Sequence, residues 1–215
     1  MGYIGEYLQR NMTILDYQQE LRKLILEYNS LMNTHLFIFA ADACKNIPDM
    51  PICQKDYYII YDMLSNKHDI NSIHVYLETP GGSGEAAEDI INFLRKHFNE
   101  VWFVISGEAK SAGTIIALSG DEILMTETAS LGPIDAQVPL GRSVISASDY
   151  MEWVLAKQAE AIETGILNHF DAIVIAQITP GELLSIKNSL EFAKDLVTQN
   201  LEKYKFRNWM ITETR

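Results

Sequence analysis

The chain has 215 residues, of which 47% are hydrophobic, and it carries a formal net charge of −12. This length and apolar content suit one globular domain with a single core, and no repeat or low-complexity run divides the chain. The acidity excludes nucleic acid as the expected partner, because binding a polyphosphate needs clustered Lys and Arg.

The first residues lack the basic stretch and the apolar run of a signal peptide, and no apolar run reaches the eighteen or so residues that span a bilayer. We therefore expect a cytoplasmic protein. Cys44 and Cys53 form no Cys-x-x-Cys pair and have no paired histidines beside them. We expect reduced thiols and no metal site, with a loop disulfide as the open alternative.

The first third of the chain alternates helical and extended patterns. Hydrophobic residues at three- and four-residue steps predict an amphipathic helix over Thr13 to Asn33. A strand over His35–Ala40 follows, and a loop over Ala41–Cys53 contains two prolines. The segment Gln54–Ser65 is again helical in pattern.

A glycine-rich turn follows the next predicted strand, Ile73–Leu77, and precedes a helix over Ser83–Phe98. The turn contains Gly81 and Gly82, which let the backbone turn its N–H groups outward, as a cradle for an oxyanion requires. The same glycines also suit a simple strand-to-helix turn with positive φ. No complete dinucleotide or P-loop motif is present, so phosphate binding is not predicted.

A serine stands between the strand Val101–Ile105 and the small-residue helix Ala112–Leu118. The strand is an unbroken β-branched and aromatic run, which predicts burial on both faces. The helix begins at Ser111, and the first amides of a helix favour an oxyanion. Ser111 is therefore a candidate nucleophile, and its alternative role is that of an N-cap.

The last part of the chain is mainly helical in pattern. A strand over Glu122–Met125 is followed by a helix over Asp149–Thr164, a break at Thr179, Pro180 and Gly181, and a helix over Glu182–Lys203. We treat the chain as one domain, with an N-terminal helix in residues 1–33, a core in 34–145 and a helical extension in 146–215. Strands that alternate with helices predict a mostly parallel sheet with right-handed crossovers.

Three blocks in order carry a family resemblance: Thr79–Gly82, Ala109–Thr114 and Leu131–Gln137. This set resembles the Clp protease and crotonase superfamily, and within it the serine dehydrogenase proteinase group of signal-peptide-peptidase-like serine peptidases. The resemblance implies an α/β fold, a spiral of mostly parallel strands with packed helices and a helical C-terminal third.

The resemblance also implies roles for individual residues. Ser111 would be the nucleophile, and the amide of Ala112 with that of Gly81 or Gly82 would form the oxyanion hole. No cofactor or metal is implied. The substrate would be a peptide or protein, lying along the strand edge at Glu78–Gly82 by β-augmentation.

The general base is where the chain departs from the Clp pattern, because Gln137 stands in the place of the catalytic histidine. Signal-peptide-peptidase-like relatives use a lysine some forty to fifty residues after the serine, and Lys157 fits that spacing. If Lys157 is the base, burial must lower its pKa by several units, since a free lysine is charged near pH 7. A lysine on an amphipathic helix is otherwise an exposed surface residue. His169 with Asp171 is a weaker alternative.

We therefore predict a serine endopeptidase with Ser111 and Lys157 as its dyad, and we take Lys110 as a surface residue. The N-terminal helix and the helix Asp149–Thr164 add more hydrophobic surface than one sheet can cover, which favours a homo-oligomer. The resemblance implies that this oligomer is a closed ring. Two other classes stay open. One is an inactive scaffold or a regulatory subunit whose partner supplies the base, and the other is a crotonase-type acyl-CoA enzyme.

Overall fold

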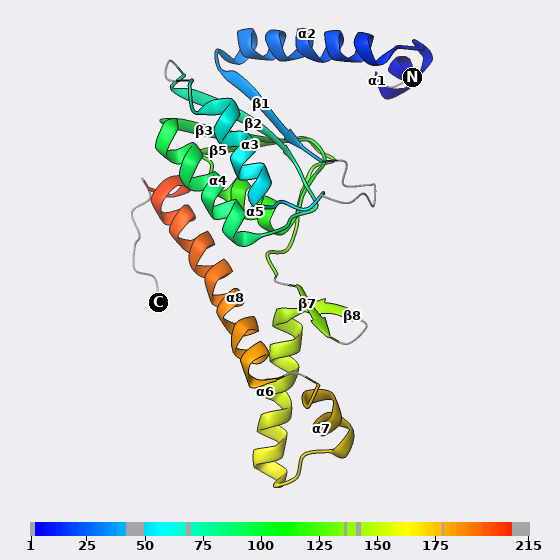
Figure 1. Cartoon of the computed structure of the whole chain (residues 1–215), viewed down its shortest axis with the longest axis vertical. Coiled ribbons are helices and arrows are strands. Elements are labelled where there is room, and N and C mark those ends of the chain that lie inside the picture. Colours follow the sequence, from blue (N-terminus) through cyan, green and yellow to red (C-terminus); the bar gives the residue numbers. More distant parts are fainter. Residues whose placement is uncertain are drawn as a thin grey trace.

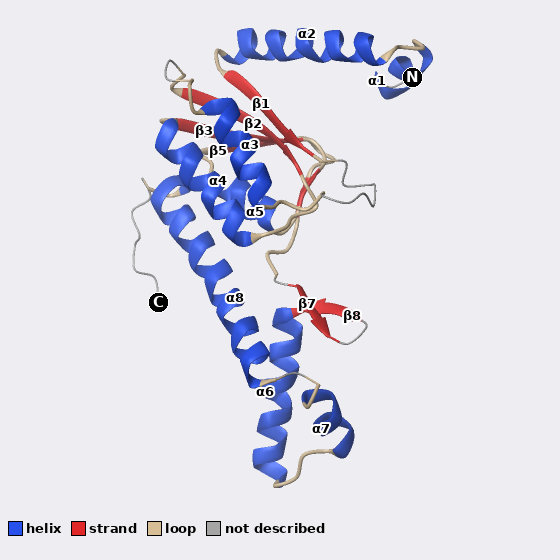
Figure 2. Cartoon of the chain, viewed as in Figure 1, coloured by secondary structure: helices blue, strands red, loops and turns tan. Residues whose placement is uncertain are grey.

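The computed structural model describes residues 3–41, 50–67, 70–135, 137–140, 143–177 and 179–207. Figure 1 shows a layered α/β body, a long helix at its upper edge, and a helical arm that extends from the opposite edge. The strands belong mostly to the body and the arm is almost entirely helical (Figure 2). Cys53 is a free thiol, and Cys44 lies outside the described residues.

Four parallel strands form the main sheet in the order β1-β2-β3-β5. Their bounds are β1 His35–Ala40, β2 Ser72–Glu78, β3 Glu100–Ile105 and β5 Glu122–Met125. Right-handed crossovers through helices are the expected connections for such a sheet. The helices α3 (Gln54–Leu64), α4 (Gly84–His97) and α5 (Ala112–Leu118) provide these connections.

The core lies on the face of the sheet that α3, α4 and α5 cover (Figure 1). Along β3, Val101, Phe103 and Ile105 are fully buried, whereas Trp102 and Val104 between them are only half-buried. The prediction that this strand is buried on both faces is therefore wrong. In a strand successive side chains point to opposite faces, and here helices of the body cover one face fully.

A second, smaller parallel layer follows β3. β4 (Glu108–Ala109) pairs with β6 (Ser130–Leu131), and an isolated bridge joins Thr79 to Ala109. Beyond this layer β7 (Gln137–Leu140) and β8 (Ser143–Ser146) form an antiparallel hairpin. The change of layer immediately before Ser111 brings the ends of β2 and β4 side by side.

The arm consists of α6 (Ala147–Thr164), α7 (His169–Ile175) and the lower half of α8 (Pro180–Asn200). Its buried cluster is small and contains only Ala147, Tyr150 and Ile186 among buried residues. α8 joins the two regions, because its first half packs in the arm and its second half packs against the main core through Phe192, Leu196 and Val197. A short π-helix, η1 (Leu201–Lys205), ends the described chain.

The long helix at the upper edge in Figure 1 is α2 (Ile14–Met32), preceded by α1 (Tyr3–Gln9). A capping box at Thr13 begins α2 and a left-handed Asn33 ends it. None of its residues is buried. Its contact with the sheet includes the Tyr28 hydroxyl, 2.7 Å from Nδ1 of His74, a side chain that also stacks on Trp102.

The α/β class with a parallel sheet and many helices is confirmed. The helices predicted from Thr13, Gln54, Ser83 and Ala112 agree with the structure within one or two residues at each end, and the strand over His35–Ala40 agrees at both ends. No pattern in the sequence indicated α1, α7 or the β7–β8 hairpin. Within the described residues, none of the helices has the length and apolar character needed to cross a membrane.

Candidate active site

Ser111 occupies the point where β4 turns into α5. Its φ is 49° and its ψ is −115°, so a non-glycine residue adopts a positive φ. Such a conformation is costly and persists where surrounding structure enforces it. Here backbone bonds from Thr79 N–H to Glu108 O (2.8 Å) and from Lys110 N–H to Thr79 O (3.0 Å) fix the approach to the serine.

The side chain of Ser111 makes no capping hydrogen bond, although the residue stands at the N-cap position of α5. The N-cap role is therefore not realised. The residue is half-buried and its hydroxyl makes no hydrogen bond within the described part of the chain, so the oxygen is available to a ligand in the cleft that it lines.

The Gly81–Gly82 turn packs directly against Ser111. Both glycines have positive φ, 105° and 151°, which side chains rarely adopt. A methyl group at Gly81 would lie 2.7 Å from Cβ of Ser111, and one at Gly82 would lie 2.3 Å from the backbone N and O of Ile52. Glycine is thus required at both positions by contact as well as by conformation.

The two glycine amides of the turn differ in whether their N–H already donates a hydrogen bond. The N–H of Gly81 donates to Oγ1 of Thr79 at 3.1 Å. The N–H groups of Gly82 and Ala112 make no hydrogen bond within the described residues. Of the two glycines that the resemblance offers, Gly82 is therefore the one with a free donor, and Ala112 provides the second.

Thr114 connects the second and third blocks of the site. Its buried hydroxyl lies 2.7 Å from Ala109 O and 3.0 Å from Gly132 O. The N–H of Gly132 donates to the Thr114 hydroxyl oxygen at 3.0 Å. A buried hydroxyl with these partners joins the strand before the serine, the helix after it and the following loop. The Ala109–Thr114 block contained this residue, but its spacing gave no indication of the role.

Lys110 is not the surface residue that we predicted. Its Nζ donates to Oγ of Ser130 at 2.7 Å and its stem packs on Gly132, where a methyl group would lie 2.4 Å from Cδ. The residue is half-buried. The amine is therefore directed to the third block and holds it against β4.

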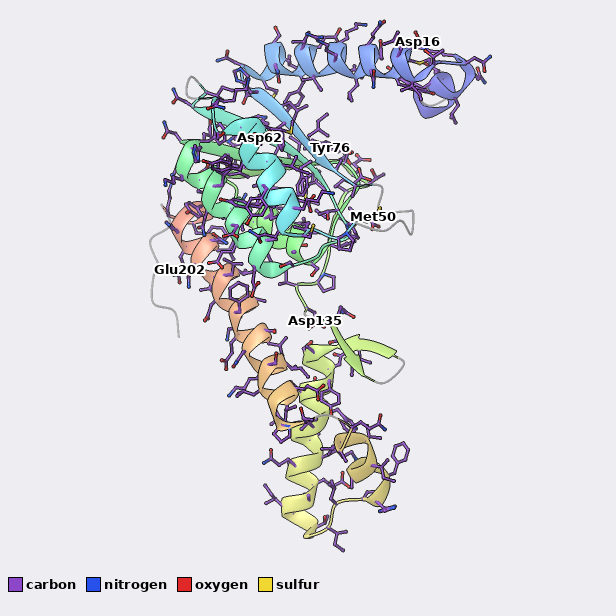
Figure 3. All side chains as sticks on the ribbon, viewed as in Figure 1. Asp16, Met50, Asp62, Tyr76, Asp135 and Glu202 are labelled. Carbon is purple, nitrogen blue, oxygen red and sulfur yellow. The ribbon has the colours of Figure 1, made fainter. Side chains whose placement is uncertain are left out.

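A cleft of about 790 Å³ lies between the serine, the glycine turn and α8. The segment that includes Ile134, Asp135 and Gln137 forms another wall, and Figure 3 shows Asp135 between the body and the β7–β8 hairpin. Further lining comes from Pro51, Pro80, Gly81, Gly82, Ser83, Gly84, Glu85, Ser111, Ala112, Ile115, Ser185, Asn188, Ser189, Phe192 and Ala193. The described lining thus contains two carboxyl groups and no Lys, Arg or His.

Asp135 is a cleft residue that the sequence reasoning did not single out. Its Oδ1 accepts from Ser148 at the first turn of α6, from the backbone N–H at 3.3 Å and from the hydroxyl at 3.1 Å. This carboxylate therefore connects the cleft to the start of the arm. Gln137, which stands where the Clp pattern has histidine, lines the cleft as well.

The predicted substrate edge at Glu78–Gly82 is already paired. Ala41 N–H donates to Glu78 O at 2.8 Å, and Ile52 N–H donates to Gly81 O at 2.7 Å. The prediction that substrate adds to this edge is therefore wrong at Glu78 and Gly81, because the chain's own segments already bond these two carbonyls. On the opposite wall, the backbone of Ile134 and Asp135 makes no hydrogen bond to other described residues.

Lys157 lies in α6, outside the cleft lining, and in Figure 1 this helix is well separated from α5. Its Nζ is 2.8 Å from Oε2 of Glu160 and 3.1 Å from Oδ2 of Asp171. Hydrogen bonds to Glu160 and then to Asp171 raise the pKa of Lys157 above its ordinary value. The predicted lowering by burial is therefore wrong for this arrangement, because two carboxylates stabilise the charged amine.

His169, the weaker alternative base, is the first residue of α7 and is exposed. It does not line the cleft, and its neighbour Asp171 is paired with Lys157. The described chain thus brings together Ser111, Gly81, Gly82 and Ala112, and it brings neither Lys157 nor His169 to them.

Comparison with known proteins identifies the family of the chain. A family model described as ClpP-like SDH-type serine proteinase matches residues 54–210. The chain belongs to this family. The match includes all three blocks of the site and the helices α6, α7 and α8.

Curated relatives match shorter segments. Two uncharacterized proteins of Methanocaldococcus jannaschii are 42% and 39% identical over 66 residues, which is 31% of this chain and 23% of each relative. ATP-dependent Clp protease proteolytic subunits of Streptococcus agalactiae are 32% identical over 96 residues, 43% of this chain and 44% of theirs. The chain therefore spans less than half the length of the relatives that it matches.

Among solved structures, two mutants of the 1510-N membrane-bound stomatin-specific protease are 23% and 22% identical and cover 72% of this chain, each with a TM-score of 0.40. The matched regions amount to 72% and 68% of the lengths of those two protease chains. The catalytic domain of the Plasmodium falciparum ClpP protease is 15% identical and covers 53% of this chain and 62% of that chain, with a TM-score of 0.36.

Proposed function

We propose that this ClpP-like family member is a serine peptidase in which Ser111 is the nucleophile. One observation carries the proposal. Ser111 has a strained backbone and lines a cleft beside the amides of Gly82 and Ala112, and neither its hydroxyl nor these two amides bond to any other described residue. Strain held at a residue that opens into a cleft is typical of a functional site.

The reaction follows from these groups. Oγ of Ser111 attacks the carbonyl carbon of a peptide bond and gives its proton to a base. The negative carbonyl oxygen accepts from the amides of Gly82 and Ala112, and the base then protonates the leaving amine. Water hydrolyses the acyl-serine by the reverse proton path.

We propose that Lys157 is the base. In the single chain it does not line the cleft with Ser111, so α6 must be placed differently when Lys157 acts. The spacing of 46 residues after Ser111 supports this assignment, because it lies within the range of the resembling lysine-dependent peptidases. A second copy that supplies the base is the alternative, and the described cleft, which has no lysine or histidine, is the observation that favours it.

The substrate in this proposal is an extended peptide. We place its backbone against Ile134 and Asp135, whose N–H and C=O groups are open, rather than against the occupied edge at Glu78–Gly82. Ile115 and Phe192 provide apolar contacts for its side chains in the same cleft.

We also propose that the chain assembles as a ring-shaped homo-oligomer. Leu24 and Leu26 on α2, and Ile162 and Phe170 in the arm, are large hydrophobic side chains that are exposed in the single chain. Burying such side chains favours association. Light scattering should give a mass that is a multiple of the mass of one chain, and a monomer at micromolar concentration would contradict assembly.

A cytoplasmic location remains a prediction, tested by cell fractionation.

Labelling by a fluorophosphonate probe tests the nucleophile. Ser111→Ala should abolish labelling and lower peptide hydrolysis by roughly 10⁴-fold or more. The melting temperature should hardly change, because the hydroxyl makes no hydrogen bond to the part of the chain that the structure describes.

Ser83→Ala is the matched control. Ser83 also lines the cleft, but its hydroxyl caps α4, so the variant should lose about 1 kcal/mol of stability and keep its labelling. Undiminished hydrolysis by Ser111→Ala would contradict the assignment. Absence of labelling and of hydrolysis in the assembled wild-type protein would favour an inactive scaffold.

A further inference from the structure

Lys157 is held by two carboxylates of different kinds. Glu160 lies one turn further along α6 and its side chain is 51% exposed, whereas Asp171 comes from α7 and its side chain is only 9% exposed. The Lys157 side chain itself is 26% exposed. The pair with Asp171 therefore joins two helices, and the Asp171 carboxylate is the least exposed of the three side chains.

Asp171 depends on this contact. Its carboxylate has Lys157 as its only polar partner in the part of the chain that the structure describes. A buried carboxylate without a partner is costly, while an exposed ion pair contributes little. Of the two carboxylates, Asp171 would therefore oppose the release of Lys157 more strongly than Glu160 would.

The contact also fixes where the amine is. α7 is short and returns against α6 in the arm, and neither helix supplies a residue to the lining of the cleft (Figure 1). While Lys157 is bonded to Asp171, it cannot also be within hydrogen-bond reach of Ser111, which lines that cleft. The two arrangements of Lys157 exclude each other.

We propose that Asp171 is a positioning residue that stores Lys157 away from Ser111, so that the chain is a latent peptidase until α6 and α7 separate at this pair. The inference rests on the proposed Ser111–Lys157 dyad. Glu160 contributes little to the storage, and Asp171 controls the fraction of molecules in which the lysine is released.

The test compares charge removal at the two carboxylates in the full chain. Asp171→Asn should raise the fluorophosphonate labelling rate and kcat about tenfold, the change that a tenfold larger released population produces. KM should stay within about twofold, because the cleft is untouched. Glu160→Gln should change either rate by less than about twofold.

Two further substitutions at the same position protect the test against simple misfolding. Asp171→Leu removes the charge with an apolar side chain of suitable size for a buried site and should activate as Asp171→Asn does. Asp171→Glu restores the carboxylate and should return the labelling rate to that of the wild type. Thermal melting checks that each variant is folded.

Unchanged or lower labelling in folded Asp171→Asn and Asp171→Leu would overturn the storage role. The double variant Asp171→Asn with Lys157→Met separates this failure from failure of the dyad. It avoids leaving Asp171 unpaired, and it should fall to the background of Ser111→Ala. If it stays as active as Asp171→Asn alone, Lys157 is not the base and both proposals fail together.

Discussion

Ser111 and Lys157 lie in two regions of the molecule that differ in how firmly they are packed. The body around Ser111 has a continuous buried core that extends from β2 and β3 through α4 and α5. The arm around Lys157 has only three buried hydrophobic residues in its own cluster, and most of α6 and α7 is exposed. The proposed nucleophile is thus fixed by a core, and the proposed base by a few polar contacts.

The difference in packing explains how the single chain can hold Ser111 and the glycine turn in place while the proposed base lies elsewhere. A core of close-packed side chains has few alternative arrangements, whereas an arm with little buried surface can repack at small cost. The joint between them is α8, which packs in both regions. Substitutions in the body, at the joint and at the upper edge of the sheet can test this contrast.

The largest expected effect is in the body, at Gly82. Gly82→Ala adds a methyl group 2.3 Å from the backbone of Ile52 and displaces the amide that we assign to the oxyanion hole. Loss of one such donor lowers kcat by about 10²–10³-fold. Peptide hydrolysis measures the loss, and thermal melting reports any accompanying loss of stability.

Gly165→Ala is the matched control from the arm. Gly165 ends α6 in a left-handed conformation, with no atom within 4 Å of the added methyl group. It should cost about 1 kcal/mol of stability and leave kcat unchanged. Equal losses of activity in the two glycine variants would contradict the contrast between body and arm.

The second effect is at the end of the joint, where Arg95 and Asp121 form a buried ion pair of 2.6 Å with 5% and 13% of their side chains exposed. Burial alone would raise the pKa of Asp121, but Arg95 and the Val101 N–H outweigh it and the pKa is lowered. Arg95 also stacks on Tyr204 of η1. Arg95→Met should therefore lower the free energy of unfolding by about 3–5 kcal/mol.

Urea unfolding measures this change. Lys187→Met, which breaks the exposed pair with Glu191 on α8, is the control and should stay within about 0.5 kcal/mol. A small effect of Arg95→Met would mean that α8 is attached to the body by its apolar side chains alone.

The smallest effect is at the upper edge, where α2 meets His74. Burial lowers the pKa of His74, and Glu100 opposes this only in part. The unfolded chain therefore binds a proton that the folded chain resists, so stability is full above about pH 6.5 and falls as the pH drops below it. Unfolding by urea at pH 7.5 and pH 5.5 measures the difference.

Two groups contact the ring directly, the Tyr28 hydroxyl and the stacked Trp102, and Trp102 fluorescence should report the same transition. His74→Gln should flatten this part of the pH dependence of stability, although protonation of the chain's carboxylates still affects stability in more acidic solution. An unchanged pH dependence in that variant would assign the effect to other groups.

The sequence alone determined the elements whose pattern is local. Alternating and continuous apolar runs located β1, β2, β3 and β5, and the order of three short blocks located Ser111 beside the Gly81–Gly82 turn. These features depend on residues near one another in the chain, where hydrophobic period and glycine content are direct signals.

Only the tertiary structure decided the features that depend on distant partners. The choice of Gly82 over Gly81 rests on a hydrogen bond to Thr79, the occupied strand edge rests on Ile52, and the half-open face of β3 rests on which helices cover it. The position of Lys157 is the clearest case. Its spacing from Ser111 is a property of the sequence, but its pairing with Asp171 is a property of how two helices fold against each other.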